Sequence, residues 1–123
     1  MTIYCTGCKK DVKAELSNGK EIYPHRPDLY TYPFWKCKSC GNYVGTHHKS
    51  NLPLRPLGVI PTPQLKEARM TIHKMLDPLW KSGKMRRKEV YNLISSQLGY
   101  QYHTAEIRSL EEAEKVLKIV TSL

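Results

Sequence analysis

The chain has 123 residues, with 20 Lys and Arg against 11 Asp and Glu, so its formal net charge is +9. This length allows one domain or two very small ones, and the absence of any long apolar run excludes a membrane-spanning helix. The strongly basic balance makes a polyanion the first partner to consider, and nucleic acid is the commonest.

The only four cysteines of the chain form two pairs, each with two residues between its members: Cys5, Cys8, Cys37 and Cys40. Such a turn presents two sulfurs to one point, and two turns together supply the four thiolates that structural Zn²⁺ prefers. The arm between the pairs has 28 residues, longer than the roughly 15–20 of the compact pattern. Residues 1–50 are therefore predicted to form a zinc ribbon that holds one structural Zn²⁺ ion.

Other uses of four cysteines fit this sequence less well. Disulfides need an oxidising compartment, and the first residues do not resemble a signal peptide. A thioredoxin-like site needs one pair in a βαβ setting, and an iron–sulfur cluster suits two distant turns less well than a single tetrahedral ion does. Because four thiolates close the coordination shell, the zinc is expected to be structural rather than catalytic.

Within the predicted ribbon, residues 12–16 alternate between apolar and polar, as in a half-buried strand. Asn18-Gly19 is typical of a tight hairpin turn, so residues 20–23 are expected to return as a second strand. The aromatic segment 29–36 is predicted to be the strand that enters the second cysteine pair, and residues 43–47 the last strand.

Residues 51–62 are rich in proline and follow neither a helical nor a strand period, so they are predicted to be a linker. A helical subdomain over residues 63–123 is expected after it, packed on or beside the ribbon. The fold class is therefore α+β, with a four-cysteine zinc ribbon of short antiparallel strands followed by helices.

Apolar residues at steps of three and four predict the helices of this second part. The first helix is expected to run from residue 63 to about residue 76, followed by a short turn or second helix over 77–83. Another helix is predicted over 86–98, with Gly99 as its stop. A capping box at residues 109–112 opens the last helix.

Two stretches make the chain similar to a known family: WKCKSCGNYVGTH at residues 35–47 and DPLWKSG at residues 77–83. They resemble the zinc-finger-containing domain family of tailed phages and prophages, over nearly the whole chain. The resemblance implies an N-terminal zinc finger, a helical tail and life in a bacterial cytoplasm, and it implies no reaction. One departure is Tyr102, because relatives often have cysteine before the late histidine, and this argues against a metal role for that position.

Five cations and no acid occupy eight residues where a turn opens a helix: Lys81, Lys84, Arg86, Arg87 and Lys88. Side chains in such a place can reach phosphates. Cations at a helix N-terminus are unfavourable with the helix dipole, so these charges are expected to have another use than helix stability. Lys36 and Lys38, beside the second cysteine pair, are predicted to add phosphate contacts. The alternative is a solvated surface.

The aromatic segment has two possible uses. If it is a strand, Tyr30, Tyr32 and Phe34 share one face and Trp35 lies on the other. The shared face could stack the bases of a single strand, or its rings could supply the core of a ribbon that has few aliphatic residues.

His47 and His48 follow the last ribbon strand, with Asn51 close behind. These residue types could hold a catalytic metal in an HNH-type nuclease, but prolines follow where that motif needs a helix. The sequence favours instead a supporting role for His47, which would hydrogen-bond near the zinc site. Other catalytic signatures are absent, so an enzyme is not expected.

The sequence as a whole predicts a cytoplasmic phage or prophage accessory protein that binds DNA or RNA without catalysis. The alternative is a protein-binding module that inhibits or modulates a host protein, for example one of antiviral defence. A metal-dependent nuclease is the third possibility.

Overall fold

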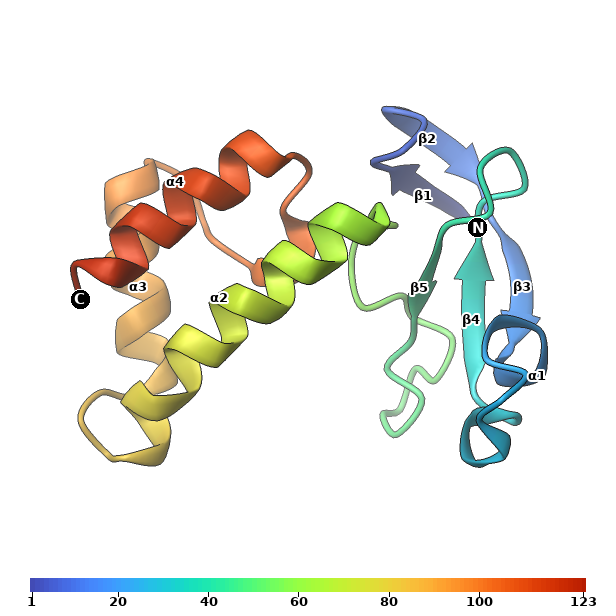
Figure 1. The fold of residues 1–123 in the computed structure, drawn as a ribbon, viewed down its shortest axis with the longest axis horizontal. Helices are drawn as coiled ribbons and strands as arrows, with labels where there is room; N and C mark the ends of the chain where they lie inside the picture. Colours follow the sequence, from blue (N-terminus) through green and yellow to red (C-terminus); the bar gives the residue numbers. More distant parts are fainter. The chain divides into compact units, whose positions relative to one another are not determined.

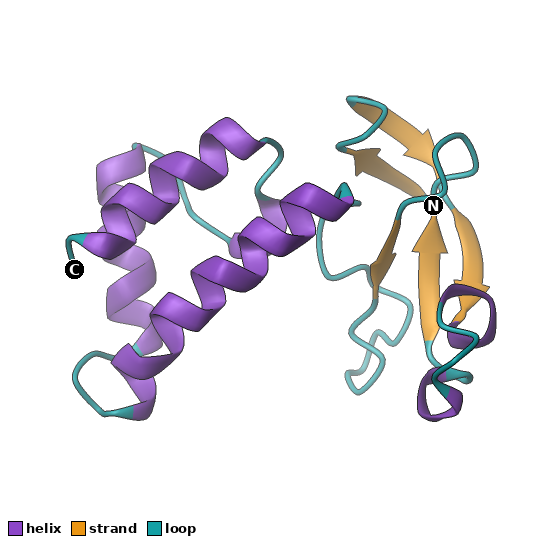
Figure 2. Cartoon of the chain, viewed as in Figure 1, coloured by secondary structure: helices purple, strands orange, loops and turns teal.

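The computed structural model describes every residue from Met1 to Leu123. The chain divides into two compact units, Met1–Thr62 and Pro63–Leu123. The first unit contains the strands and the second the three long helices (Figures 1 and 2), so the predicted α+β class is confirmed. None of the helices combines the length and the apolar character needed to cross a membrane.

The first unit is built from two small antiparallel sheets. In one, β1 (Thr2–Cys5) pairs with β2 (Lys10–Lys13). In the other, the strand order is β3 (Glu15–Asn18), β4 (Pro33–Lys36) and β5 (Tyr43–Gly45). The first cysteine pair begins at Cys5, the last residue of β1, and the second pair lies in the loop after β4, so each sheet positions one pair.

The predicted hairpin at Asn18-Gly19 and the strand after it are wrong. Residues Gly19–Ile22 form a single helical turn, α1, and the Asn18 side chain caps it by accepting a hydrogen bond from the Glu21 amide at 3.1 Å. Gly19 is required by a close approach, because a Cβ there would lie 1.6 Å from the carbonyl oxygen of Leu29. Gly19 is therefore needed for its close packing against the backbone of Leu29 and not for a hairpin turn.

The predicted aromatic strand is shorter than expected. β4 contains only Pro33–Lys36, and Tyr30 and Tyr32 precede it in an irregular segment, so the prediction that they share a strand face with Phe34 is wrong. Tyr30 instead donates a hydrogen bond to a backbone carbonyl at 2.5 Å. Trp35 is buried in the core of the unit, while Phe34, one residue before it on the strand, is only half-buried.

The proline-rich segment 51–62 forms hydrogen bonds with the rest of the first unit. The Thr6 amide donates to the carbonyl of Ile60 at 2.9 Å, and the indole of Trp35 donates to the carbonyl of Leu54 at 2.7 Å. Residue 60 is fully buried. The segment therefore contributes Ile60 to the core of this unit. The buried residues of that core are Ile3, Cys5, Ala14, Trp35, Cys37, Val44 and Ile60.

The second unit has three helices, α2 (Pro63–Lys81), α3 (Arg87–Leu98) and α4 (Leu110–Thr121), with a short 3₁₀ turn, η2 (Thr104–Glu106), before the last. Gly99 ends α3 with a positive φ of 85°, as predicted. The apolar faces of the three helices meet in one core, to which the segments on either side of η2 add Tyr102 and Ile107. Its buried residues are Leu65, Ile72, Leu76, Val90, Ile94, Tyr102, Ile107, Ala113, Val116 and Val120.

Helix α2 does not end at Leu76 as predicted but continues through Pro78 to Lys81. A proline inside a helix removes one backbone donor and costs about 3 kcal/mol. Here Leu76 is fully buried, and Leu79 and Trp80 pack against the same core on the far side of the proline. Burying these side chains offsets the cost, so apolar packing overrides the local breaker.

The predicted capping box is confirmed at the start of α4. The Ser109 hydroxyl accepts a hydrogen bond from the Glu112 amide at 3.1 Å. The Glu112 carboxylate reaches back one residue further than the standard box and accepts from the Arg108 amide at 2.8 Å.

Candidate metal centre

Two turns of matching geometry hold the cysteine pairs. The amide of Lys9 donates to the carbonyl of Cys5, and the amide of Gly41 donates to the carbonyl of Cys37, both at 2.8 Å. Lys9 and Gly41, which each follow the second cysteine of a pair, both have positive φ, 57° and 79°. Glycine adopts a positive φ without strain. For lysine a positive φ is uncommon, so the residue type at position 9 does not predict it.

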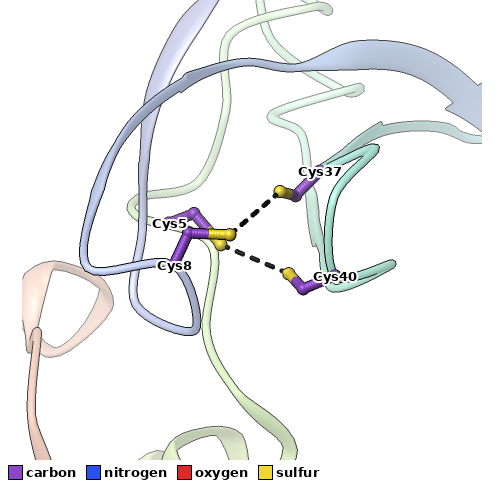
Figure 3. Close-up of side chains that lie close together, drawn as sticks. All are labelled: Cys5, Cys8, Cys37 and Cys40. Carbon is purple, nitrogen blue, oxygen red and sulfur yellow. Dashed lines mark hydrogen bonds between the residues drawn. The ribbon is translucent and has the colours of Figure 1, made fainter.

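The four sulfurs converge between the two turns (Figure 3). The Cys5 and Cys40 sulfurs are 3.5 Å apart, the Cys8 and Cys37 sulfurs are 3.7 Å apart, and all four lie within 4.8 Å of one another. These distances are far longer than the roughly 2.05 Å of a disulfide. Four thiolates placed about 2.3 Å from one tetrahedral ion would be about 3.8 Å apart. The cysteines therefore form a possible metal site whose size fits zinc.

The acidity of the thiols differs across the site. Burial raises the pKa of Cys5, and the pKa of Cys8 is raised to about 12, chiefly by its hydrogen bond with Cys37. Burial also acts to raise the pKa of Cys37. The amides of Cys40 and Ser39 and the neighbouring thiols outweigh burial, so the pKa of Cys37 is lowered to about 7. In the metal-free protein, Cys37 is therefore ionised before Cys5 and Cys8.

Residues between the cysteines fix the first turn against the rest of the unit. Thr6 is buried, and its hydroxyl donates to the carbonyl of Ile60 at 2.8 Å and accepts from the amide of Thr62 at 2.9 Å. Gly7 lies so close to the second turn that a Cβ would be 2.8 Å from the side-chain amide of Asn42. No local sequence signal indicates either role, because the partners of Thr6 and Gly7 lie more than 30 residues away.

A family model described as a zinc-finger-containing domain matches residues 1–122. The chain belongs to this family. No curated protein matches the chain, and no solved structure matches it. The family and the four clustered cysteines together suggest a structural zinc site in this zinc-finger-containing domain.

His47 and His48 of this zinc-finger-containing domain lie outside the cysteine cluster. His47 is exposed, and its side chain forms no hydrogen bond with a cysteine. The ring of His48 stacks on Tyr32 with 4.2 Å between ring centroids. Both histidines line a shallow hollow of about 380 Å³ whose other residues include no carboxylate. The hollow therefore lacks the carboxylate that, together with the histidines, would bind the catalytic metal of a nuclease.

The seven candidate cations of the domain fall into two groups, one in each unit. Lys36 lies on β4, where a 2.8 Å hydrogen bond with the Glu21 carboxylate raises its pKa, and Lys38 is exposed between Cys37 and Cys40. The other group is exposed around the end of α2 and the start of α3. We call its five members the basic turn: Lys81, Lys84, Arg86, Arg87 and Lys88.

Proposed function

We propose that this protein binds nucleic acid without catalysis, with a structural zinc ion holding the first unit and the basic turn contacting phosphates. The observation that carries the proposal is the concentration of five exposed cations within eight residues that contain no acid. We further propose that it acts in a bacterial cytoplasm as a phage or prophage accessory protein, on the strength of the sequence resemblance.

The charges of the basic turn are poorly neutralised by the chain itself. Lys81 lies 3.8 Å from the Asp77 carboxylate and Arg86 lies 3.9 Å from that of Glu89, both at the outer limit of an ion pair and exposed to solvent. Exposed ion pairs of this kind contribute little to the stability of the fold. The other three cations form no ion pair. A polyanion would relieve the mutual repulsion of all five, and release of its counterions would favour binding.

The metal centre supports a binding role rather than a reaction. Four cysteine thiolates would complete the tetrahedral shell of Zn²⁺ and leave no position for an activated water. The ion would supply folding free energy to a unit with a small apolar core. Lys38 lies inside the second metal turn, so the bound ion would also fix the position of this cation.

The proposal is tested by charge reversal in the basic turn, using Lys84→Glu with Arg86→Glu. The matched control is Lys115→Glu with Lys118→Glu, which makes the same change of net charge at two exposed positions of α4. Fluorescence anisotropy with labelled DNA and RNA, over a range of salt concentrations, gives the affinity and its salt slope. We expect the basic-turn variant to lose about tenfold or more in affinity and its slope to fall by about two, while the control loses much less. Equal losses in the two variants, or none, would remove the basic turn from the proposed function.

A direct contact with a host protein is the competing outcome. Pull-down from bacterial lysate, with and without nuclease treatment, separates the two. Capture of a protein that survives nuclease treatment and high salt, together with absent oligonucleotide binding, would replace nucleic acid with a protein partner. Cleavage of the oligonucleotide that disappears in His47→Ala would indicate a nuclease instead.

A further inference from the structure

A groove of about 480 Å³ lies in the second unit, between α3 and the loop that precedes η2. The residues that could recognise a ligand there are two cations, one ring, two amides and a histidine: Arg87, Lys88, Tyr91, Asn92, Gln101 and His103. Four of them lie on α3 as two pairs of residues four positions apart, Arg87 with Tyr91 and Lys88 with Asn92, so they form one stripe along the helix. No carboxylate lines the groove.

Hydrogen bonds hold the two walls of the groove together. The Ser95 hydroxyl on α3 donates to the carbonyl of Tyr91 at 2.7 Å and accepts from the amide of Tyr102 at 2.9 Å. Tyr102 is buried, and its hydroxyl lies 2.6 Å from that of Thr104. These contacts fix the loop against the helix, so the groove is largely formed before any ligand arrives.

Aromatic contacts hold the side chains at one end. The Tyr91 ring meets the rings of Trp80 and Tyr102 edge to face, with centroids 6.3 and 5.5 Å away. The guanidinium of Arg87 lies 4.7 Å from the centroid of Trp80. Stacking in this way directs Arg87 without neutralising it, and neither Arg87 nor Lys88 has a carboxylate partner.

We propose that this groove binds one nucleoside phosphate unit. Arg87 and Lys88 hold the phosphate, the base lies along Tyr91, and the side-chain amides of Asn92 and Gln101 hydrogen-bond its edge. The volume falls within the roughly 300–1,000 Å³ of small-ligand sites, which suits a nucleotide and is too small for a duplex. The ligand's source is either an unstacked nucleotide of a single strand, in which case the inference rests on the proposed function, or a free nucleotide.

The test is an NMR titration of the full-length, metal-loaded protein with adenosine 5′-monophosphate and, separately, with inorganic phosphate. We expect the nucleotide to shift the amide signals of residues 87–92 and 101–103, and phosphate to shift only those next to Arg87 and Lys88. Asn92→Ala with Gln101→Ala removes two exposed amide groups at unchanged charge and should weaken nucleotide binding about fivefold or more, leaving the phosphate response intact. Ser96→Ala with Gln97→Ala, exposed on α3 outside the groove, is the matched control and should change neither.

Identical shift patterns for nucleotide and phosphate, or unchanged nucleotide affinity in the groove variant, would overturn the groove while leaving the basic turn untouched. The source of the ligand is decided by comparing an eight-nucleotide single strand, its duplex and the mononucleotide. A single strand bound about tenfold more tightly than both others places the groove within nucleic-acid binding. Groove shifts with the mononucleotide but no binding of any oligonucleotide would keep the groove and overturn the proposed function.

Discussion

The two units of the chain reach stability by different means. The first has strands of three or four residues, and two of its metal-site cysteines, Cys5 and Cys37, belong to its buried core. The second unit has a core made largely of aliphatic side chains from three helices, and no cysteine contributes to it. A metal site can therefore replace part of a hydrophobic core where short strands bury little surface.

Removal of the metal tests this comparison most strongly. A chelator that strips the metal-loaded protein should unfold the first unit, because structural zinc supplies on the order of 10 kcal/mol to such folds. Two-dimensional NMR should then lose the dispersed signals of residues 1–62 and keep those of 63–123. Restoring Zn²⁺ should restore the lost signals. Survival of the first unit, or loss of both units together, would contradict the difference between them.

A cavity in the core of the second unit should destabilise that unit and leave the metal site of the first unit intact. Ile72 is fully buried, so Ile72→Ala should lower the free energy of unfolding of the second unit by about 2–5 kcal/mol. Urea unfolding followed by helical circular dichroism measures the loss, and zinc content should stay at one ion per chain. Met70→Ala, an exposed position on the same helix, should change stability by less than about 0.5 kcal/mol. Similar losses for the two variants would refute the assigned core.

The affinity of the first unit for metal should rise with pH. In the metal-free protein the raised pKa values of Cys5 and Cys8 keep both thiols protonated at pH 7, so binding must displace at least two protons. The zinc affinity should therefore increase by about 100-fold or more per pH unit, and more steeply below pH 7, where Cys37 is also protonated. Competition with a chromophoric chelator at pH 6, 7 and 8 measures this slope. A slope near zero would show that the thiols are already ionised.

The smallest effect should come from the helix cap of the second unit. Ser109→Ala removes the hydroxyl that accepts from the Glu112 amide and should cost about 1 kcal/mol. Thermal unfolding of the metal-loaded protein measures it. Ser122→Ala, at the other end of the same helix, removes a hydroxyl that caps no amide and should have a smaller effect. A larger loss for Ser122→Ala would place the stabilising contact at the wrong end of α4.

The features that could be predicted from the sequence are those whose signal is local. Four such features depend on residues within a few positions of one another. They are the spacing within each cysteine pair, the periodicity over α3 and α4, the stop at Gly99 and the capping box at Ser109. The physical reason is that turn geometry, helix periodicity and capping are set by short-range backbone constraints. The family resemblance was also carried by contiguous motifs.

Features that depend on partners farther along the chain are seen only in the folded protein. Gly19 serves a close approach to Leu29 rather than a hairpin, and α2 continues through Pro78 because the residues on both sides of it are buried. Two further features could not be predicted from the sequence. They are the hydrogen bonds of Thr6 with residues 60 and 62, and the groove between α3 and residues 101–103. Local preferences amount to a few kcal/mol or less, and burial against residues far away in the sequence is large enough to override them.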